Sequence, residues 1–223
     1  MRVVMIHALA ESVSPVKVAF GEVFPEAELI NLLDEALFVD FKGQITPQLR
    51  RRMSQLICYC EEYGADAIGL ACSVYAPVVE TAKDLVEVPV VSSYSPVMEE
   101  AVKAGKRIGI VASVGATLRD SDYYLQLTAE GQGRSIETEL CFAEELIPLH
   151  RTQGEEAFNQ RLEELVLDLS ERVDAVLLGQ FSMASALNRL QEVCPVPVLS
   201  GPHSSANKLK ELLSVPVWPG LND

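Results

Sequence analysis

The sequence predicts an α/β protein made of two similar lobes, each built on a parallel sheet. Short apolar segments alternate along the chain with longer segments of helical periodicity, as is typical of parallel strands covered by helices on both faces. The second half also contains a faint copy of the first. DAIGLACSVYA from Asp66 matches DAVLLGQFSMA from Asp174, and VPVVS at 88–92 matches VPVLS at 196–200, with a constant offset of 108 residues. We therefore expect two half-domains with a binding cleft between them.

The strand candidates are short runs rich in β-branched residues, as expected of strands buried on both faces. We expect strands at residues 2–7, 27–32, 66–71, 88–93, 107–112, 135–140, 174–179 and 196–200. The run at 135–140 is more polar than the others, which indicates an edge strand.

Helical segments fill the intervals between these strands. The clearest begins at Thr46-Pro47, where Thr46 is expected to cap the helix and Pro47 to occupy its first turn, and it ends near Gly64. Other helices are expected at 14–22, 74–85, 95–104, 116–131, 155–173, 183–193 and 203–214. This alternation predicts doubly wound lobes of the Rossmann or flavodoxin-like type.

The repeat divides the chain into two lobes related by pseudo-twofold symmetry. The first lobe is expected to comprise residues 1–94 plus 203–223 and the second residues 95–202, because the last helix is expected to cross back to the first lobe. The connections SSYSP and LSGPHSS stand at matching ends of matching strands. Their Ser, Pro and Gly content is typical of hinge loops.

Composition limits the partners and the compartment. The formal net charge of −14 disfavours nucleic acid and anionic membranes, because both repel a negative surface. No apolar run approaches the ~18 residues that span a bilayer, and the N-terminal MRVVMIHALAES is interpreted as a first strand rather than a signal peptide. We therefore expect a cytoplasmic protein without membrane contact.

Neither the cysteines nor the glycines indicate a cofactor. The five cysteines have no paired spacing, so disulfides are not expected in a cytoplasmic protein. Neither CxxC nor HxxxH occurs, so no metal site is expected. GxGxxG and the phosphate-loop motif are also missing, so no nucleotide cofactor is expected.

Cys72 stands at the carboxyl end of a buried strand, where parallel sheets bind ligands. The N-terminus of the following helix is expected to lower the thiol pKa below its ordinary value of about 8.5. A thiolate there could remove a proton or add to an electrophilic carbon. The alternative is a buried cysteine that only packs. The remaining cysteines lack this setting and are expected to be structural: Cys58, Cys60, Cys141 and Cys194.

Hydroxyl groups and histidines stand near other strand ends. Ser113 and Thr117 belong to a glycine-containing turn between a strand and a helix. Hydroxyls and backbone N–H groups in such a turn either bind a carboxylate or simply cap the helix, and Ser182 has the same two interpretations. His7 and His203 are candidates for substrate contact, and the alternative is that neighbouring protein groups satisfy their ring nitrogens.

Several segments, taken in order, resemble a known family: DAIGLACSVYAP, RIGIVASVGATLRDSDYY, DAVLLGQFSMASAL and VPVLSGP. They resemble the aspartate/glutamate racemase superfamily, which includes hydantoin racemase, maleate isomerase and arylmalonate decarboxylase. The resemblance implies a cofactor-independent racemase or isomerase that acts at the carbon α to the carboxylate of a small amino or dicarboxylic acid. It also implies a homodimer. Racemases of this family use two cysteines that face each other across the cleft.

Cys72 matches the first of these cysteines, whereas Gln180 occupies the position of the second. A carboxamide cannot act as a general acid or base near pH 7. Gln180 is therefore expected to donate a hydrogen bond to a carboxylate or enolate oxygen. Carboxylate binding beside Cys72 depends on Ser73 and on backbone N–H groups.

Different reactions remain open at this point. His7 or His203 could be the second base of a racemase, or a decarboxylase could protonate one face of its intermediate with Cys72 alone. Cys72 could also add to a double bond, as cis–trans isomerisation requires. The rival from another class is a non-catalytic carboxylate-binding protein, which a thiol pKa near 8.5 or above would favour.

Overall fold

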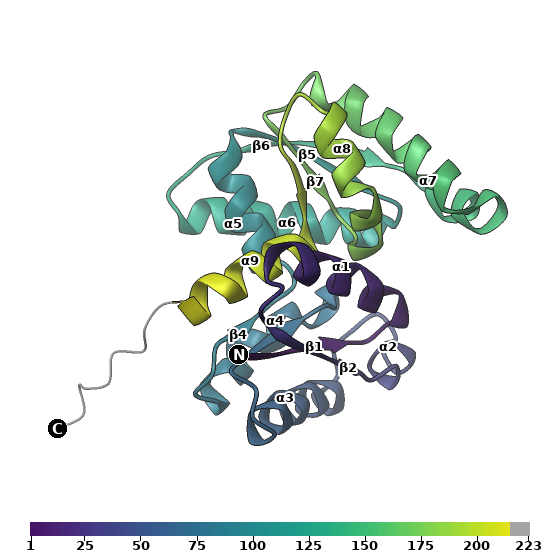
Figure 1. The fold of residues 1–223 in the computed structure, drawn as a ribbon. Coiled ribbons are helices and arrows are strands. Elements are labelled where there is room, and N and C mark those ends of the chain that lie inside the picture. The colour runs from purple at the N-terminus through teal and green to yellow at the C-terminus, as the bar shows by residue number, and fades with distance from the viewer. Residues whose placement is uncertain (215–223) are drawn as a thin grey trace.

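The computed structural model describes residues 1–214, and the expected place of 215–223 in the first lobe lies outside the described residues. The chain forms two four-stranded parallel sheets, one in each lobe (Figure 1). The first has the order β2-β1-β3-β4, with β1 (Arg2–His7), β2 (Glu28–Leu33), β3 (Ala67–Leu70) and β4 (Val90–Val91). The second has the order β6-β5-β7-β8, with β5 (Arg107–Ala112), β6 (Glu137–Phe142), β7 (Ala175–Leu178) and β8 (Val198–Ser200). The predicted fold class is confirmed.

Helices cover both faces of each sheet. The α-helices are α1 (Val13–Val23), α2 (Ala36–Val39), α3 (Pro47–Glu62), α4 (Ala76–Ala82), α5 (Ser95–Ala104), α6 (Gly115–Gly131), α7 (Leu146–Ser170), α8 (Leu187–Val193) and α9 (Gly201–Ser214). Short 3-10 helices are η1 (Ala10–Ser12), η2 (Ser73–Tyr75), η3 (Lys83–Leu85) and η4 (Phe181–Ala186). None of the helices within residues 1–214 has the length and apolar character needed to cross a membrane.

The helix boundaries differ from expectation at a few places. The segment expected as one helix at 74–85 is η2, α4 and η3 in succession. The helix expected from residue 155 is preceded by a further helical segment that begins at Leu146, and Gly154 with φ 85° forms the kink between the two. Such a left-handed backbone conformation is open to glycine at little cost. The short helix α2 was not predicted.

The Thr46-Pro47 prediction is confirmed. The Thr46 side chain accepts a hydrogen bond from the backbone N–H of Leu49 at 3.2 Å, and Pro47 begins α3. Gly64, with φ 84°, follows the end of the helix. This capped helix buries Met53 and Ile57 against the first sheet.

The repeated aspartates do the same structural work in both lobes. The Asp66 carboxylate accepts a hydrogen bond from the backbone N–H of Arg2 at 2.6 Å. Asp174 accepts from the backbone N–H groups of Lys106 and Arg107, both at 2.8 Å. In each lobe the carboxylate therefore ties the start of the third strand to the start of the first, which explains this identity in the repeat.

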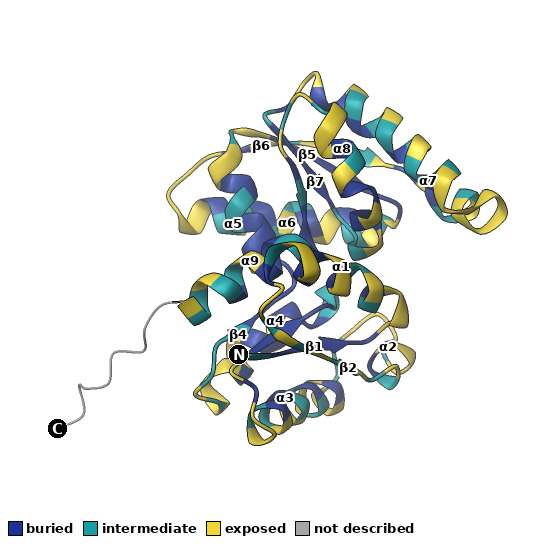
Figure 2. Cartoon of the chain, viewed as in Figure 1, coloured by how far each residue is buried: buried dark blue, intermediate teal, exposed yellow. Residues whose placement is uncertain are grey.

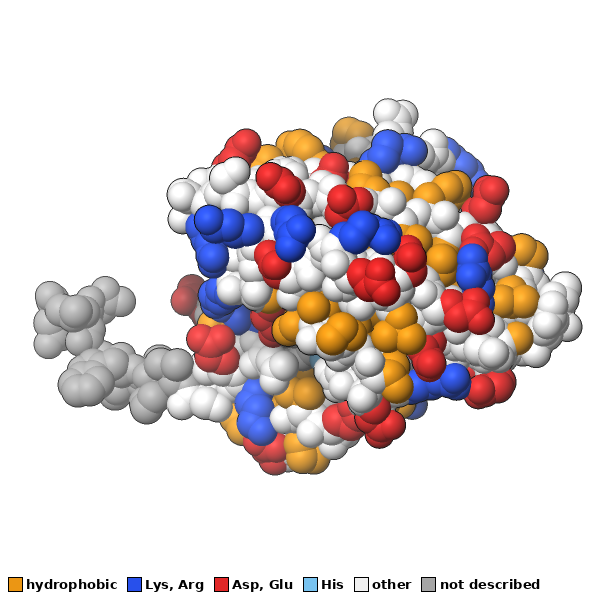
Figure 3. Space-filling view, turned by 90° about the horizontal axis from the view of Figure 1, so that it is seen from above, with side chains coloured by type: hydrophobic (Ala, Val, Ile, Leu, Met, Phe, Trp, Pro, Cys, Tyr) orange, Lys and Arg blue, Asp and Glu red, His pale blue; other side chains and the backbone are white. Residues whose placement is uncertain are grey.

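Helix α9 lies between the two lobes and packs mainly on α1 of the first (Figure 1). Ala206 and Leu209 are fully buried against the first sheet, in a cluster with Val3 and Met5. The buried residues follow the strands and the inner faces of the helices, whereas the outer faces, above all that of α7, are exposed (Figure 2). Acidic and basic side chains are interspersed on the face seen from above (Figure 3).

Candidate active site

A cavity of about 540 Å³ lies between the lobes, at the carboxyl ends of the parallel strands. Cys72 and Ser73, just after β3, line it from the first lobe. Gln180 and Phe181, just after β7, line it from the second. The two positions that the repeat makes equivalent therefore line the same cavity.

Cys72 is partly buried in the wall of this cavity. The backbone N–H groups of Val74 and Tyr75 act on the sulfur and lower its pKa, but burial outweighs them and raises the thiol pKa to about 11. The expectation of a pKa below 8.5 was therefore wrong. Cys72 is followed directly by η2 and α4, and the hydrogen bonds from the first N–H groups of this segment do not offset the desolvation of the thiolate. Cys72 consequently keeps its proton at neutral pH.

Gln180 is held in one orientation by Ser113. Its Oε1 atom accepts hydrogen bonds from the backbone N–H of Ser113 at 2.7 Å and from the Ser113 hydroxyl at 2.6 Å. A backbone N–H can only donate, so the atom that faces it must be the carboxamide oxygen. The NH₂ group of Gln180 is then the end with hydrogen atoms left to donate.

The hydroxyls predicted for substrate binding separate into two groups. Ser73, Thr117 and Ser182 line the cavity. Ser113 is buried and is not part of the cavity wall, and its N–H and hydroxyl are both engaged by Gln180. Its expected contact with substrate is corrected to a role in positioning Gln180.

Neither histidine expected at the site lines the cavity. His7 is fully buried, and its ring nitrogens lie 2.6 Å from the Ser12 hydroxyl and 2.8 Å from Oδ1 of Asn31. Burial lowers the pKa of His7, and the contact of its ring with the Ser12 hydroxyl supports Ser12, which does reach the cavity.

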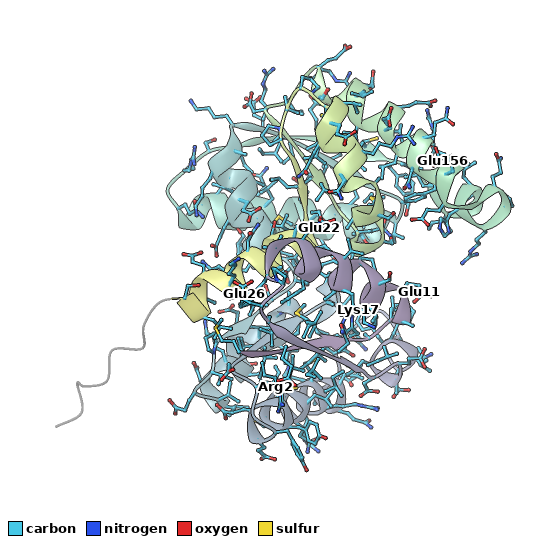
Figure 4. The ribbon with its side chains drawn as sticks, in the orientation of Figure 1. Arg2, Glu11, Lys17, Glu22, Glu26 and Glu156 are labelled. Carbon is cyan, nitrogen blue, oxygen red and sulfur yellow. The ribbon has the colours of Figure 1, made fainter. Side chains whose placement is uncertain are left out.

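His203 lies on α9 and bridges the lobes instead of facing the cavity. Its Nδ1 is 2.9 Å from the Ser200 hydroxyl and its Nε2 is 2.9 Å from Glu22. Glu22 stands on α1 at the junction of the lobes (Figure 4) and also accepts a hydrogen bond from Asn188 at 2.9 Å. The structure thus removes both histidines as candidates for the second base.

Sequence reasoning missed a group of hydroxyls at the hinge. Ser93, Tyr94 and Ser121 line the cavity and are buried. The acids Glu11, on η1 just before α1 (Figure 4), and Asp120 line it as well. The SSYSP segment was identified only as a hinge, and its serine and tyrosine content was the available signal.

Much of the remaining wall is apolar. Its larger side chains include Leu9, Phe38, Phe41, Val74, Met98 and Phe181. A cavity that combines such a wall with a few polar groups is typical of a site for a small organic molecule.

Comparison with known proteins agrees with this architecture. A family model described as Asp/Glu/Hydantoin racemase matches residues 18–216. No match is found among the curated proteins.

Solved structures with the same fold cover nearly the whole chain. Allantoin racemase from Klebsiella pneumoniae has a TM-score of 0.74 at 19% identity, over 96% of this chain and 88% of that one. An aspartate racemase homologue from Pyrococcus horikoshii OT3 also has a TM-score of 0.74, at 23% identity, over 96% and 99% of the two chains. Glutamate racemase from Aquifex pyrophilus has a TM-score of 0.61 at 20% identity, over 95% and 83%.

Proposed function

Because the chain belongs to the Asp/Glu/hydantoin racemase family, we propose that it is a cofactor-independent enzyme of the racemase/isomerase type. It acts at the carbon α to the carboxyl group of a small amino or dicarboxylic acid or a related compound. The observation that carries this proposal is that Cys72 and Gln180, which occupy matching positions in the two lobes, line one cavity.

Cys72 is the group that transfers the proton. In the protonating direction the S–H bond breaks and its electron pair stays on sulfur, while the electron pair of the enolate forms the new C–H bond. In the reverse direction a thiolate takes the α-proton and the enolate forms again. The raised pKa of Cys72, about 11, favours the protonated thiol and hence the role of proton donor.

Gln180 stabilises the negative charge that this transfer creates. With its oxygen held by Ser113, its NH₂ group donates to a carboxylate or enolate oxygen. Ser73, Thr117 and Ser182 supply further hydroxyls around the same cavity. These groups bind charge without exchanging protons near pH 7.

Decarboxylation is the second candidate, and the difference between the two walls favours it. A two-base racemase needs a proton-transferring group on each face of the α-carbon, whereas the second wall carries a carboxamide. In a decarboxylase the C–C bond to CO₂ breaks, its electron pair forms the enolate, and Cys72 protonates one face. Thiol addition to a double bond needs a thiolate, as α-proton removal does, and burial opposes that form in both reactions.

The thiol pKa of about 11 lies above the value of about 8.5 named in the sequence analysis and so favours the rival, a non-catalytic carboxylate-binding protein. It does not exclude an enzyme, because a proton donor also carries its proton at neutral pH. Exchange chemistry separates them. The protein is incubated in D₂O with aspartate, glutamate, asparagine, glutamine and phenylmalonate, and α-proton NMR signals and CO₂ release are followed. Exchange or gas release supports the enzyme; neither, with saturable binding, supports the binding protein.

The family membership also leads us to propose a homodimer that works in the cytoplasm. Light scattering coupled to size exclusion tests the first statement, because a dimer has twice the 24.4 kDa mass of the chain. A monomer at working concentration would refute it.

A further inference from the structure

His7 and Ser12 are buried polar residues that the proposed reaction does not use. His7 ends β1 and is 0% exposed, and Ser12 ends η1 and is 7% exposed. Ser12 nevertheless lines the cavity between the lobes, whereas His7 contacts Ser12 without lining the cavity itself. An imidazole behind a hydroxyl at a cavity wall is an arrangement that can activate the hydroxyl as a nucleophile.

Three side chains form a continuous series of contacts that leads from the cavity into the first lobe. Oγ of Ser12 lies 2.6 Å from Nδ1 of His7, and Nε2 of His7 lies 2.8 Å from Oδ1 of Asn31 on β2. Both ring nitrogens are therefore engaged, which fixes the orientation of the ring. A nucleophile, a base and an orienting group at such distances are the geometric signature of an activated hydroxyl.

The position of the ring proton follows from Asn31. Its Oδ1 atom can only accept a hydrogen bond, so Nε2 of His7 carries the proton. A second proton on Nδ1 would make the ring a buried cation, and burial opposes this by lowering the pKa of His7. Nδ1 is therefore the acceptor that faces Ser12.

The Ser12 hydroxyl has one hydrogen and two acceptors within reach. Nδ1 of His7 lies 2.6 Å from Oγ, and the carbonyl oxygen of Leu9 lies 2.8 Å from it. If the hydrogen pointed to Leu9, the lone pairs of Oγ and Nδ1 would face each other at 2.6 Å, which is unfavourable. The hydrogen therefore lies between Oγ and Nδ1, where His7 can take it when Oγ attacks a carbon atom.

The same cavity holds a donor for the oxygen atom that becomes negative during acyl transfer. Helix η1, which carries Ser12, contacts η4, which begins immediately after Gln180. Gln180 lines the cavity with Ser12, and its NH₂ group has hydrogen atoms left to donate. A donor of this kind stabilises the negative oxygen of a tetrahedral intermediate.

The wall around Ser12 suits an acyl group without charge. Leu9 and Phe38 are apolar parts of the wall, and Glu11, the residue before Ser12, adds a carboxylate to it. An anionic acyl group would be repelled by this carboxylate. An uncharged acyl group can pack against the apolar side chains instead.

We propose that Ser12, His7 and Asn31 form a second reactive centre, at which Ser12 takes the acyl group of an uncharged ester or thioester. Oγ bonds to the acyl carbon while the hydroxyl proton passes to Nδ1 of His7 and the carbonyl electron pair moves onto oxygen. When that pair returns, the bond to the leaving group breaks, and the leaving group departs with its electron pair and the proton from His7. Water then releases the carboxylic acid by the same steps.

Reaction with p-nitrophenyl trimethylacetate, followed by peptide mapping, tests the proposal. Its hindered acyl group leaves an ester that hydrolyses slowly, so the adduct persists long enough to be located. Tandem mass spectrometry of the wild-type protein is expected to find the acyl group on Ser12. Its absence from Ser12 after complete release of p-nitrophenolate would overturn the proposal.

Other serines share one feature of Ser12 and serve as internal controls. Ser73 and Ser182 line the cavity, but within residues 1–214 neither is hydrogen-bonded to a histidine. Ser200 lies 2.9 Å from Nδ1 of His203 but does not line the cavity. All three are expected to be acylated about 10²-fold more slowly than Ser12. Equal acylation of any of them would show that access or a histidine alone suffices, which contradicts the proposal.

Substitutions separate the nucleophile from the base. Ser12→Ala is expected to remove the adduct without transfer of the label to another serine of the cavity. His7→Gln removes the base, so acylation of Ser12 is expected to slow by about 10²-fold. Acylation of Ser12 at the wild-type rate in a folded His7→Gln protein would show that His7 does not activate it.

Asn31 is a positioning residue, because it acts through the ring of His7. Asn31→Ala removes the acceptor for the Nε2 proton and is expected to slow acylation about tenfold. Asn31→Asp keeps an acceptor at the same place and is expected to restore a rate close to that of the wild type. Loss of acylation in Asn31→Asp would show that the NH₂ group is needed, and the arrangement would be wrong.

NMR of protein with ¹⁵N-labelled histidine tests the ring proton without any variant at these positions. The chain has three histidines, so the spectrum is simple, and substitution of His150 and His203 identifies the signals of His7. His7 is expected to carry its proton on Nε2. A proton on Nδ1 would mean that His7 donates to Ser12 and cannot take its proton, which would overturn the proposal.

The second centre and the proposed function can fail separately, because Cys72 takes no part in acyl transfer to Ser12. Acylation of Ser12 without α-proton exchange of any acid would support this centre and remove the proposed function. Exchange without acylation would do the reverse. If the label reaches Ser12 in the wild type but not in Cys72→Ala, the thiol is the first nucleophile and the proposal is wrong.

Discussion

The two lobes have the same sheet order but different chemistry at the same position. In the first lobe the third strand leads to Cys72, a thiol whose pKa burial raises to about 11. In the second the equivalent strand leads to Gln180, a carboxamide fixed by Ser113. One wall of the cavity can therefore give or take a proton, and the other can only hold charge.

The hydrogen bonds that position the strands before Cys72 and Gln180 are the same in the two lobes. The carbonyl oxygen of Pro89 accepts a hydrogen bond from the N–H of Ile68 at 2.9 Å, and that of Pro197 accepts from Val176 at the same distance. Asp66 and Asp174 hold the opposite ends of the strands in both lobes. The repeat thus preserves the groups that place the strand ends, while the residues at those ends have diverged. For this reason we expect proton transfer to occur at only one face of the α-carbon, the face toward Cys72.

Removing the thiol should have the largest effect. Cys72→Ala deletes the proton-transferring group, so α-proton exchange in D₂O is expected to fall about 10²- to 10⁴-fold. Cys58→Ala, in the same lobe but outside the cavity wall, is the control and should exchange at the wild-type rate. Full turnover in Cys72→Ala would show that the first wall carries no essential acid or base.

Substitution of Gln180, on the opposite wall of the cavity, should have the next largest effect on activity. Gln180→Ala removes a donor to the developing charge, and kcat/KM is expected to fall about 10²-fold, mainly through kcat. Gln180→Glu keeps the shape and size of the side chain but has no NH₂ group and adds negative charge, so its loss should be at least as large. Activity retained in Gln180→Glu would show that the NH₂ group is not the functional end.

The protonation state of the Cys72 thiol can be measured directly. A thiol with a pKa of about 11 instead of 9.0 carries about 100-fold less thiolate at pH 7. Alkylation of Cys72 by iodoacetamide, followed by mass spectrometry, should accelerate up to pH 11 in the folded protein. In urea the same profile should level off near pH 9. A folded-state profile that levels off below pH 9 would contradict the account of burial.

Loss of the Ser113 hydroxyl, which helps to hold Gln180, should have the smallest effect on activity. Ser113→Ala removes one of two hydrogen bonds to Gln180, so kcat should fall about 2- to 10-fold with little change in KM. Ser185→Ala, an exposed position on η4, serves as the control. A loss confined to KM would point to direct substrate contact by Ser113.

The sequence was sufficient to predict the two sheets and to place Cys72 and Gln180 at equivalent strand ends, because the offset of 108 residues is constant. It could not predict the thiol pKa, because desolvation depends on the packing around Cys72 that only the fold reveals. His7 was assigned to the site by its position at a strand end, but its ring points to Ser12 and Asn31. Tyr94 was not predicted as a site residue, because it lies in the connection between β4 and α5. Whether such a residue lines the cavity depends on how the two lobes pack, which the sequence pattern does not reveal.

The handedness of deuterium incorporation tests the central claim most directly. Each enantiomer of the exchanging acid is incubated with wild-type protein in D₂O, and the product is analysed by NMR and chiral chromatography. A one-sided site predicts that one enantiomer exchanges with retention of configuration, while the other exchanges far more slowly. Exchange of both enantiomers at similar rates, with inversion, would require a proton-transferring group on both walls and would contradict the account.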